Sequence, residues 1–168
     1  MVLHLGLSLF LSLSGVSVVE SSPDCRHQPA LMGAYISGTN LIELCQANVH
    51  RAEQDLEQVL RHEMVHAIQE NFDWKESVIP EPWLTWLVRW TMDDREVMNV
   101  LLYDPMETDQ EFEARLLANL PNWVIGGLLW VSETRHRAVH DGVKLAHPWE
   151  VLPVDAIFWR DPYALARR

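Results

Sequence analysis

The 168-residue chain is long enough for one compact domain with a hydrophobic core and too short for two ordinary domains. Hydrophobic residues make up 48% of it and charged residues 22%, which excludes disorder as a description of the whole chain. Lys and Arg number 13 against 24 Asp and Glu, and the resulting net charge of −11 argues against nucleic acid or an anionic membrane surface as a partner.

Residues 1–21 are predicted to be a secretory signal peptide, followed by one domain over 22–168. Leu5–Val19 carries no charge, which suits the apolar region of such a signal, and it is shorter than the roughly 20 residues that span a bilayer. On this interpretation the protein is secreted or periplasmic, no membrane span remains after signal removal, and Cys25 and Cys45 can pair in an oxidising compartment. The alternative is that the alternating Leu and Ser residues form a first strand or a buried hairpin of a cytoplasmic protein.

A small β unit and then a series of helices are predicted after this segment. β-Prone residues in 31–46 lie on both sides of a turn-like stretch, which predicts a β-hairpin. Apolar residues at helical spacing then predict four helices, and prolines indicate an irregular tail. The helices are predicted over 52–72, 83–103, 107–119 and 122–136, and the tail over 145–164. The expected fold class is therefore α+β, mostly helical, with a small β-sheet before the first helix of this series.

Two features of the later helices have structural interpretations. Trp83, Trp86 and Trp90 recur at i, i+3 and i+7, which is typical of a helix face buried in the core. Gly126 and Gly127 interrupt the last helix and indicate either a close helix contact or a hinge.

The predicted helix 52–72 contains the sequence HEMVH, an HExxH motif made of His62, Glu63 and His66. Side chains four residues apart lie on the same helix face, so His62 and His66 can both present imidazole nitrogens to one zinc ion. Glu63 is offset around the helix and can reach a zinc-activated water without being a ligand, as a general base must. The motif therefore predicts one Zn²⁺ per chain, against the alternative of a plain amphipathic helix with solvated histidines.

The motif and the residues downstream of it resemble the zincin-type zinc metallopeptidases. Glu111-Phe112-Glu113-Ala114 is similar to the E-x-x-A segment of several Glu-zincin families. These include the membrane-associated CAAX-type peptidases, the mitochondrial ATP-synthase-processing protease and the repressor-cleaving peptidases of the ImmA type. The resemblance implies a zincin-like domain in which Glu111 is the third zinc ligand. Glu113 is the rival, because it lies on the other side of the same helix.

The residue after Ala114 departs from that pattern. Some of these families have an aspartate there, which orients a zinc-bound histidine. Arg115 stands at this position and can pair with Glu111 at i+4, which would weaken the assignment of the third ligand. His136 and His140 are also four residues apart and could form a second metal site. No carboxylate lies between them, and two histidines alone do not complete a ligand set.

The resemblance implies a metalloendopeptidase that hydrolyses a peptide or protein substrate, with Glu63 as the base. By the same resemblance, Leu41–Asn48 contains the strand that borders the cleft and accepts the substrate by β-augmentation. Four side chains are candidates to stabilise the oxyanion of the reaction: Tyr103, His136, His140 and His147. The alternative functions are a zincin-derived, non-catalytic peptide-binding or regulatory module with a structural zinc, and a helical interaction protein without metal.

Overall fold

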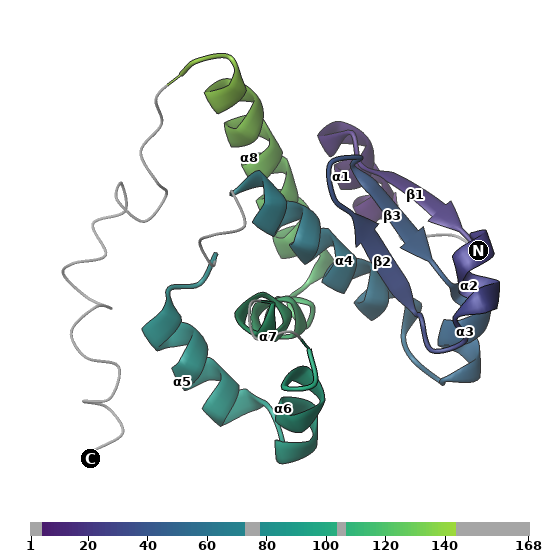
Figure 1. The fold of residues 1–168 in the computed structure, drawn as a ribbon. Coiled ribbons are helices and arrows are strands. Elements are labelled where there is room, and N and C mark those ends of the chain that lie inside the picture. The colour runs from purple at the N-terminus through teal and green to yellow at the C-terminus, as the bar shows by residue number, and fades with distance from the viewer. Residues whose placement is uncertain (1–4, 73–77, 104–106, 144–168) are drawn as a thin grey trace.

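The computed structural model describes residues 5–72, 78–103 and 107–143, which form helices and one three-stranded sheet. The elements in chain order are α1 (Leu5–Ser14), β1 (Ser17–Glu20), α2 (Pro23–His27), β2 (Gly33–Ile36), β3 (Leu41–Leu44), α3 (Gln46–Arg51), α4 (Leu56–Asn71), α5 (Glu81–Thr91), α6 (Asp94–Val100), α7 (Thr108–Leu117) and α8 (Asn122–His140). In Figure 1 the sheet lies together with α1, α2 and α3 at one side of the molecule. α5 and α6 lie at the other side, and α4, α7 and α8 lie between these two groups. The predicted α+β class, mostly helical, is confirmed.

The sheet has the strand order β1-β3-β2. β2 and β3 pair antiparallel, with Gly33 opposite Leu44 and Ile36 opposite Leu41, which confirms the predicted hairpin. Its turn contains Gly38 at a φ of 74°, a left-handed conformation that favours glycine. β1 pairs parallel with β3 on the other side. A parallel pair needs a long connection, and here α2 and β2 supply it.

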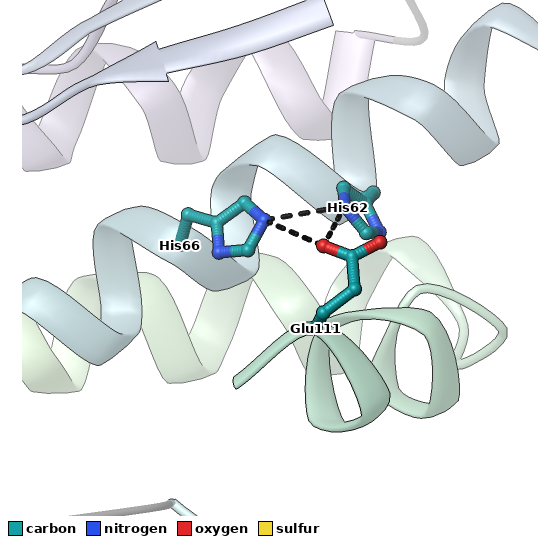
Figure 2. Close-up of side chains that lie close together, drawn as sticks. All are labelled: His62, His66 and Glu111. Carbon is teal, nitrogen blue, oxygen red and sulfur yellow. Dashed lines mark hydrogen bonds and ion pairs between the residues drawn. The ribbon is translucent and has the colours of Figure 1, made fainter. Parts of the chain in front are cut away.

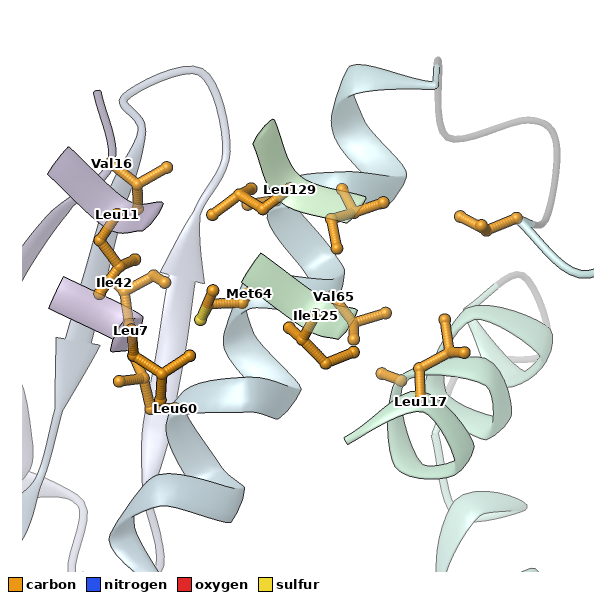
Figure 3. Packing of buried hydrophobic residues seen from close by; sticks show 14 of the residues in the cluster. Leu7, Leu11, Val16, Ile42, Leu60, Met64, Val65, Leu117, Ile125 and Leu129 are labelled. Carbon is orange, nitrogen blue, oxygen red and sulfur yellow. The ribbon is translucent and has the colours of Figure 1, made fainter. Parts of the chain in front are cut away.

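Within the predicted signal peptide, the described residues from Leu5 onward include α1 and β1. Leu7 and Leu11 of α1 are 0% and 4% exposed and belong to the hydrophobic core (Figure 3). α1 packs along α8, where a Cβ at Gly126 would stand 2.1 Å from Cδ2 of Phe10. Gly126 therefore marks a close helix contact. Cleavage after residue 21 would remove both elements, and it stays a prediction.

Cys25 and Cys45 form a disulfide with an S–S distance of 2.01 Å, the pairing expected in an oxidising compartment. The bond joins α2 to the residue that follows β3. Asn48 of α3 reinforces this connection, because its side-chain amide donates hydrogen bonds to the backbone carbonyls of Cys25, Gln28 and Leu31. The segment that leads into α4 is thereby held against the rest of the β unit.

α4 is the central helix and carries the HExxH motif. The Asp55 side chain accepts a hydrogen bond from the Glu57 backbone N–H, so the helix begins at Leu56 rather than at the predicted 52. Leu60, Met64 and Ile68 are each 0% exposed and belong to the hydrophobic core, where α4 packs on the sheet and on α8. Leu60 and Met64 are labelled in Figure 3. Burial of this face fixes which side of α4 turns toward α7.

The helix predicted over 83–103 is two helices, α5 and α6. The break comes at Asp93, whose side chain accepts from the Glu96 N–H while the Glu96 carboxylate accepts from the Asp93 N–H. This reciprocal capping box starts a new helix. The Asp-x-x-Glu spacing is visible in the sequence, where it gives the signal for the break.

The prediction that the tryptophan stripe of α5 is core was wrong. Leu84 and Val88 are the buried side chains of this helix, at 3% and 9% exposure, whereas Trp90 is 68% exposed. Trp83 and Trp86 are half-buried and contact each other edge to face, with ring centroids 6.0 Å apart. α5 packs on α7 and buries these two aliphatic side chains, and the tryptophan rings contact one another along the helix.

α7 and α8 match the predicted helices closely. α7 covers Thr108–Leu117 against the predicted 107–119, and α8 covers Asn122–His140 against the predicted 122–136. The predicted tail 145–164 lies outside the described residues. Within the described ranges, no helix combines the length and apolarity that a membrane span requires.

Candidate metal centre and catalytic site

His62 and His66 of α4 and Glu111 of α7 point toward one another (Figure 2). The two histidine Nε2 atoms are 3.2 Å apart. Glu111 Oε2 lies 3.5 Å from Nε2 of His62 and 3.7 Å from Nε2 of His66. The sequence places the histidines one turn apart, and the packing of α7 on α4 supplies the carboxylate.

This donor set fits a zinc ion. Tetrahedral zinc with ligands at about 2.0–2.1 Å holds its ligand atoms about 3.3–3.4 Å apart. The three separations of 3.2, 3.5 and 3.7 Å in the structure lie close to that value. Two imidazole nitrogens and one carboxylate oxygen also match the three protein ligands of catalytic zinc sites. In the described part of the chain, no other group of three or more His, Cys, Asp or Glu side chains is arranged to hold a metal.

Arg115 pairs with Glu111, as its position at i+4 allowed. The Arg115 Nε donates to Glu111 Oε1 at 2.9 Å, whereas the other oxygen, Oε2, faces the two histidines. The pair therefore occupies one oxygen and leaves the second for a metal. It orients the carboxylate for monodentate binding, so it does not count against Glu111 as a ligand.

Glu113 lies away from the three converging side chains. It is 0% exposed, and its Oε2 accepts a hydrogen bond from Gln69 Nε2 at 2.8 Å. Its Oε1 accepts from the backbone N–H of Ile79. Gln69 in turn contacts His66, since Gln69 Oε1 is 2.9 Å from His66 Nδ1. Sequence reasoning missed Gln69, although its position three residues after His66 on the same helix could have indicated it.

The protonation states of the ligands suit a metal site. Burial, followed by the neighbouring His62, lowers the pKa of His66 to about 4, so its imidazole is neutral at pH 7. Burial raises the pKa of Glu111, but hydrogen bonds and charges from His62 and Arg115 outweigh burial and lower that pKa to about 2. A neutral imidazole and an ionised carboxylate are the forms that bind zinc.

Glu63 stands beside the three residues and is 6% exposed. Its carboxylate lies against β2, where it accepts a hydrogen bond from the backbone of Tyr35. Gly33 makes the approach possible, because a Cβ there would stand 2.9 Å from Glu63 Oε1. Burial raises the pKa of Glu63 to about 7, against the opposing effects of His62 and Tyr35. A carboxyl with a pKa near the working pH suits proton transfer in both directions.

A cavity of about 350 Å³ opens over this site. Its lining includes His62, Glu63 and Glu111, and also Tyr103 and Arg115. Of the four candidates for an oxyanion-stabilising group, Tyr103 is the one that lines this cavity within the described residues. His136 and His140 are exposed on α8 and do not line it, and His147 lies outside the described residues.

Comparison with known proteins gives no match to this chain, whether by family model, by curated protein or by solved structure. The zincin resemblance therefore stays a prediction that rests on its motif residues, His62, Glu63, His66 and Glu111.

The expectation that the strand within Leu41–Asn48 borders the cleft was wrong. β3 is the central strand and pairs on both sides, with β1 and β2, so its backbone cannot accept a further strand. β2 is the edge strand nearest the site, and Gly33 at its start lines the cavity. The sequence did not indicate this because β1, which occupies the other side of β3, lies within the predicted signal peptide.

Proposed function

We propose that the protein is a zinc metalloendopeptidase with one Zn²⁺ per chain, held by His62, His66 and Glu111. The observation that carries the proposal is the convergence of these three donors, 3.2–3.7 Å apart, next to a buried glutamate whose pKa is raised to about 7. A purely structural site has no use for such a glutamate beside its ligands.

In this proposal some residues bind the zinc ion and others transfer a proton or stabilise charge. A zinc ion in this position supplies a Lewis acid that polarises the scissile carbonyl and lowers the pKa of a water. Glu63 takes the proton of the attacking water and delivers it to the leaving nitrogen. Tyr103, in the same cavity, donates a hydrogen bond to the oxygen on which negative charge develops.

The substrate in this proposal is an extended peptide that lies along β2. Within the described residues, β2 has no strand on its outer side, and its first residue, Gly33, contacts Glu63. A peptide added to that edge gains backbone hydrogen bonds and brings its carbonyl carbon beside the base. The Cys25–Cys45 disulfide further favours an oxidising compartment, secreted or periplasmic, as the place of action.

The alternative function is a zincin-derived, non-catalytic module that binds a peptide in the cavity around a structural zinc. It shares the three ligands and the edge strand with the enzyme. The two differ in Glu63, because only the enzyme requires a base that is buried, aimed at the cavity and close to neutral in pKa.

The test is Glu63→Gln, which preserves the shape of the side chain and removes its ability to accept a proton. We expect the variant to bind one zinc per chain and to lose hydrolysis of an unfolded protein substrate. Glu57→Gln, on the same helix but outside the cavity lining, is the control and keeps both properties. Hydrolysis by Glu63→Gln at the parent rate would refute the proposed base, and loss of its zinc would make Glu63 a ligand.

A further inference from the structure

The hydrogen bonds behind His66 form a continuous chain from α4 to α7. His66 Nδ1 lies 2.9 Å from Gln69 Oε1, and Gln69 Nε2 lies 2.8 Å from Glu113 Oε2. Gln69 and Glu113 are 1% and 0% exposed, so water does not compete for these bonds. Two buried polar side chains that bond in sequence to the half-buried His66 have few alternative arrangements.

The acceptors around Gln69 fix the orientation of its amide. Its Nε2 faces two oxygens, Glu113 Oε2 and the backbone carbonyl of Gln110 at 2.9 Å. The Gln110 carbonyl can only accept, whatever the protonation state of Glu113, so the NH₂ group of Gln69 must face it and its Oε1 must face His66. Glu113 itself is held in place by the Ile79 N–H on its other oxygen.

The orientation of Gln69 in turn fixes the tautomer of His66. An amide oxygen only accepts, so Nδ1 of His66 must carry the ring proton. The lone pair of the neutral ring is then on Nε2, the atom that lies 3.2 Å from His62 Nε2 and 3.7 Å from Glu111 Oε2. Nε2 is the nitrogen that a metal at this position requires.

We propose that Glu113 and Gln69 are positioning residues, and that the chain Glu113–Gln69–His66 sets His66 in the tautomer and ring orientation that bind zinc. The inference rests on the proposed zinc site and adds to it the residues that prepare it. Here the role that an aspartate often has toward a zinc-bound histidine is divided between an amide and a carboxylate on two helices.

The hydrogen-bonded series Glu113–Gln69–His66 predicts which variants lose zinc affinity and which combination regains it. In Glu113→Gln, the Ile79 N–H still needs an oxygen, so the new NH₂ group faces the NH₂ group of Gln69. If Gln69 keeps its orientation, two donors face each other; if its amide turns, its oxygen meets the Gln110 carbonyl and His66 Nδ1 meets a donor, which favours the wrong tautomer. Gln69→Glu brings a second carboxylate against Glu113 in a buried site. Both single variants should bind zinc about 10–100-fold more weakly, as is usual when the partner of a ligand is lost.

The double variant Gln69→Glu with Glu113→Gln restores the polarity of the chain. The new carboxylate at position 69 accepts from His66 Nδ1, and the new amide at position 113 donates to its other oxygen. We expect the double variant to recover only part of the zinc affinity, because the Gln110 carbonyl still lacks its donor. The control is Glu133→Gln. It alters a buried carboxylate on α8 that accepts a hydrogen bond from the Asn71 amide of α4, away from His66, and it should leave zinc affinity unchanged.

Two measurements decide the proposal: zinc affinity in competition with a chromophoric chelator, and the His66 tautomer by long-range ¹H–¹⁵N correlation in the metal-free full chain. The expected results are an Nδ1–H tautomer in the parent, weak single variants and a stronger double variant. An Nε2–H tautomer in the parent, or a double variant no tighter than the weaker single, would overturn the proposal. If the parent has the Nδ1–H tautomer but binds no zinc, the orienting role of the hydrogen bonds Glu113–Gln69–His66 is supported and the proposed function is refuted.

Discussion

Two neighbouring glycines in α8 are predicted to respond to alanine with opposite signs. Gly126 faces Phe10 of α1, and an added Cβ would lie 2.1, 2.4 and 2.8 Å from three atoms of that ring. Gly127 has nothing within 4 Å of the same added atom. The two substitutions therefore have the same effect on the helix backbone and different effects on the contact between α1 and α8.

The magnitudes follow from these contacts. Alanine in place of glycine inside a helix stabilises by roughly 0.5–1 kcal/mol, which is all that Gly127→Ala should show. In Gly126→Ala the ring and α1 must shift, and overpacking of this kind costs typically about 1–3 kcal/mol. For a chain of 150–250 residues, 1 kcal/mol moves the melting temperature by about 2–4 °C. Because the backbone gain also applies to Gly126→Ala, its net cost is at most about 2.5 kcal/mol; we expect a fall of up to about 10 °C for Gly126→Ala and a rise of about 1–4 °C for Gly127→Ala.

The assay is thermal unfolding of both variants and the parent, with the mass of each chain checked so that residues 1–168 are present. A rise in melting temperature for both variants would refute the docking of α1 on α8. The same result is expected if residues 1–21 are removed as a signal peptide, because Phe10 then leaves with them. The mass of the chain therefore tests the predicted cleavage, and the sign for Gly126→Ala in the full chain tests the packing of α1 on α8.

Three further predictions concern the site. Glu111→Ala should weaken zinc binding by more than about 100-fold, beyond the usual loss for a partner of a ligand, while His136→Ala on exposed α8 leaves it unchanged in the same chelator competition. In the metal-free protein, the pKa of Glu111 is lowered from 4.5 to about 2, so its ionisation stabilises the fold above about pH 4.5 and this contribution is lost as the pH falls toward 2. Denaturant titrations at pH 6 and pH 3 should therefore differ less for Glu111→Gln than for the parent, and an equal difference would contradict the shift. Gly33→Ala pushes a Cβ to 2.9 Å from Glu63 Oε1 and should slow hydrolysis without loss of zinc, whereas Gly127→Ala, with nothing within 4 Å of the added atom, should leave the rate unchanged.

The sequence predicted those parts of the fold that local spacing determines. The HExxH helix, the hairpin of β2 and β3, α7 and α8 all follow from periodicity, turn residues and prolines. The resemblance to the E-x-x-A families implied Glu111 rather than Glu113, and the helix period added that only one of these two residues can face α4. The capping box at Asp93 was also local, and it was overlooked within a continuous apolar pattern.

The parts that were missed depend on contacts between distant segments. The Leu–Ser alternation of residues 5–14 gave no helical signal, and α1 is stabilised by packing on α8, more than 100 residues later. β3 is the central strand because β1 pairs with it in parallel, and β1 lies within the residues predicted to be a signal peptide. Gln69 and Glu113 become visible as partners only when α7 lies across α4, which brings their side chains to 2.8 Å.

The central claim is that a zinc ion held by this chain hydrolyses peptide bonds. The most direct measurement is the hydrolysis of an unfolded protein substrate by the full chain, before chelation, after chelation and after zinc is restored, with metal content measured at each step. The account predicts one zinc per chain at the start, no hydrolysis after its removal, and recovery when one equivalent returns. A chain that binds no zinc, or whose hydrolysis is the same with and without the metal, would contradict it.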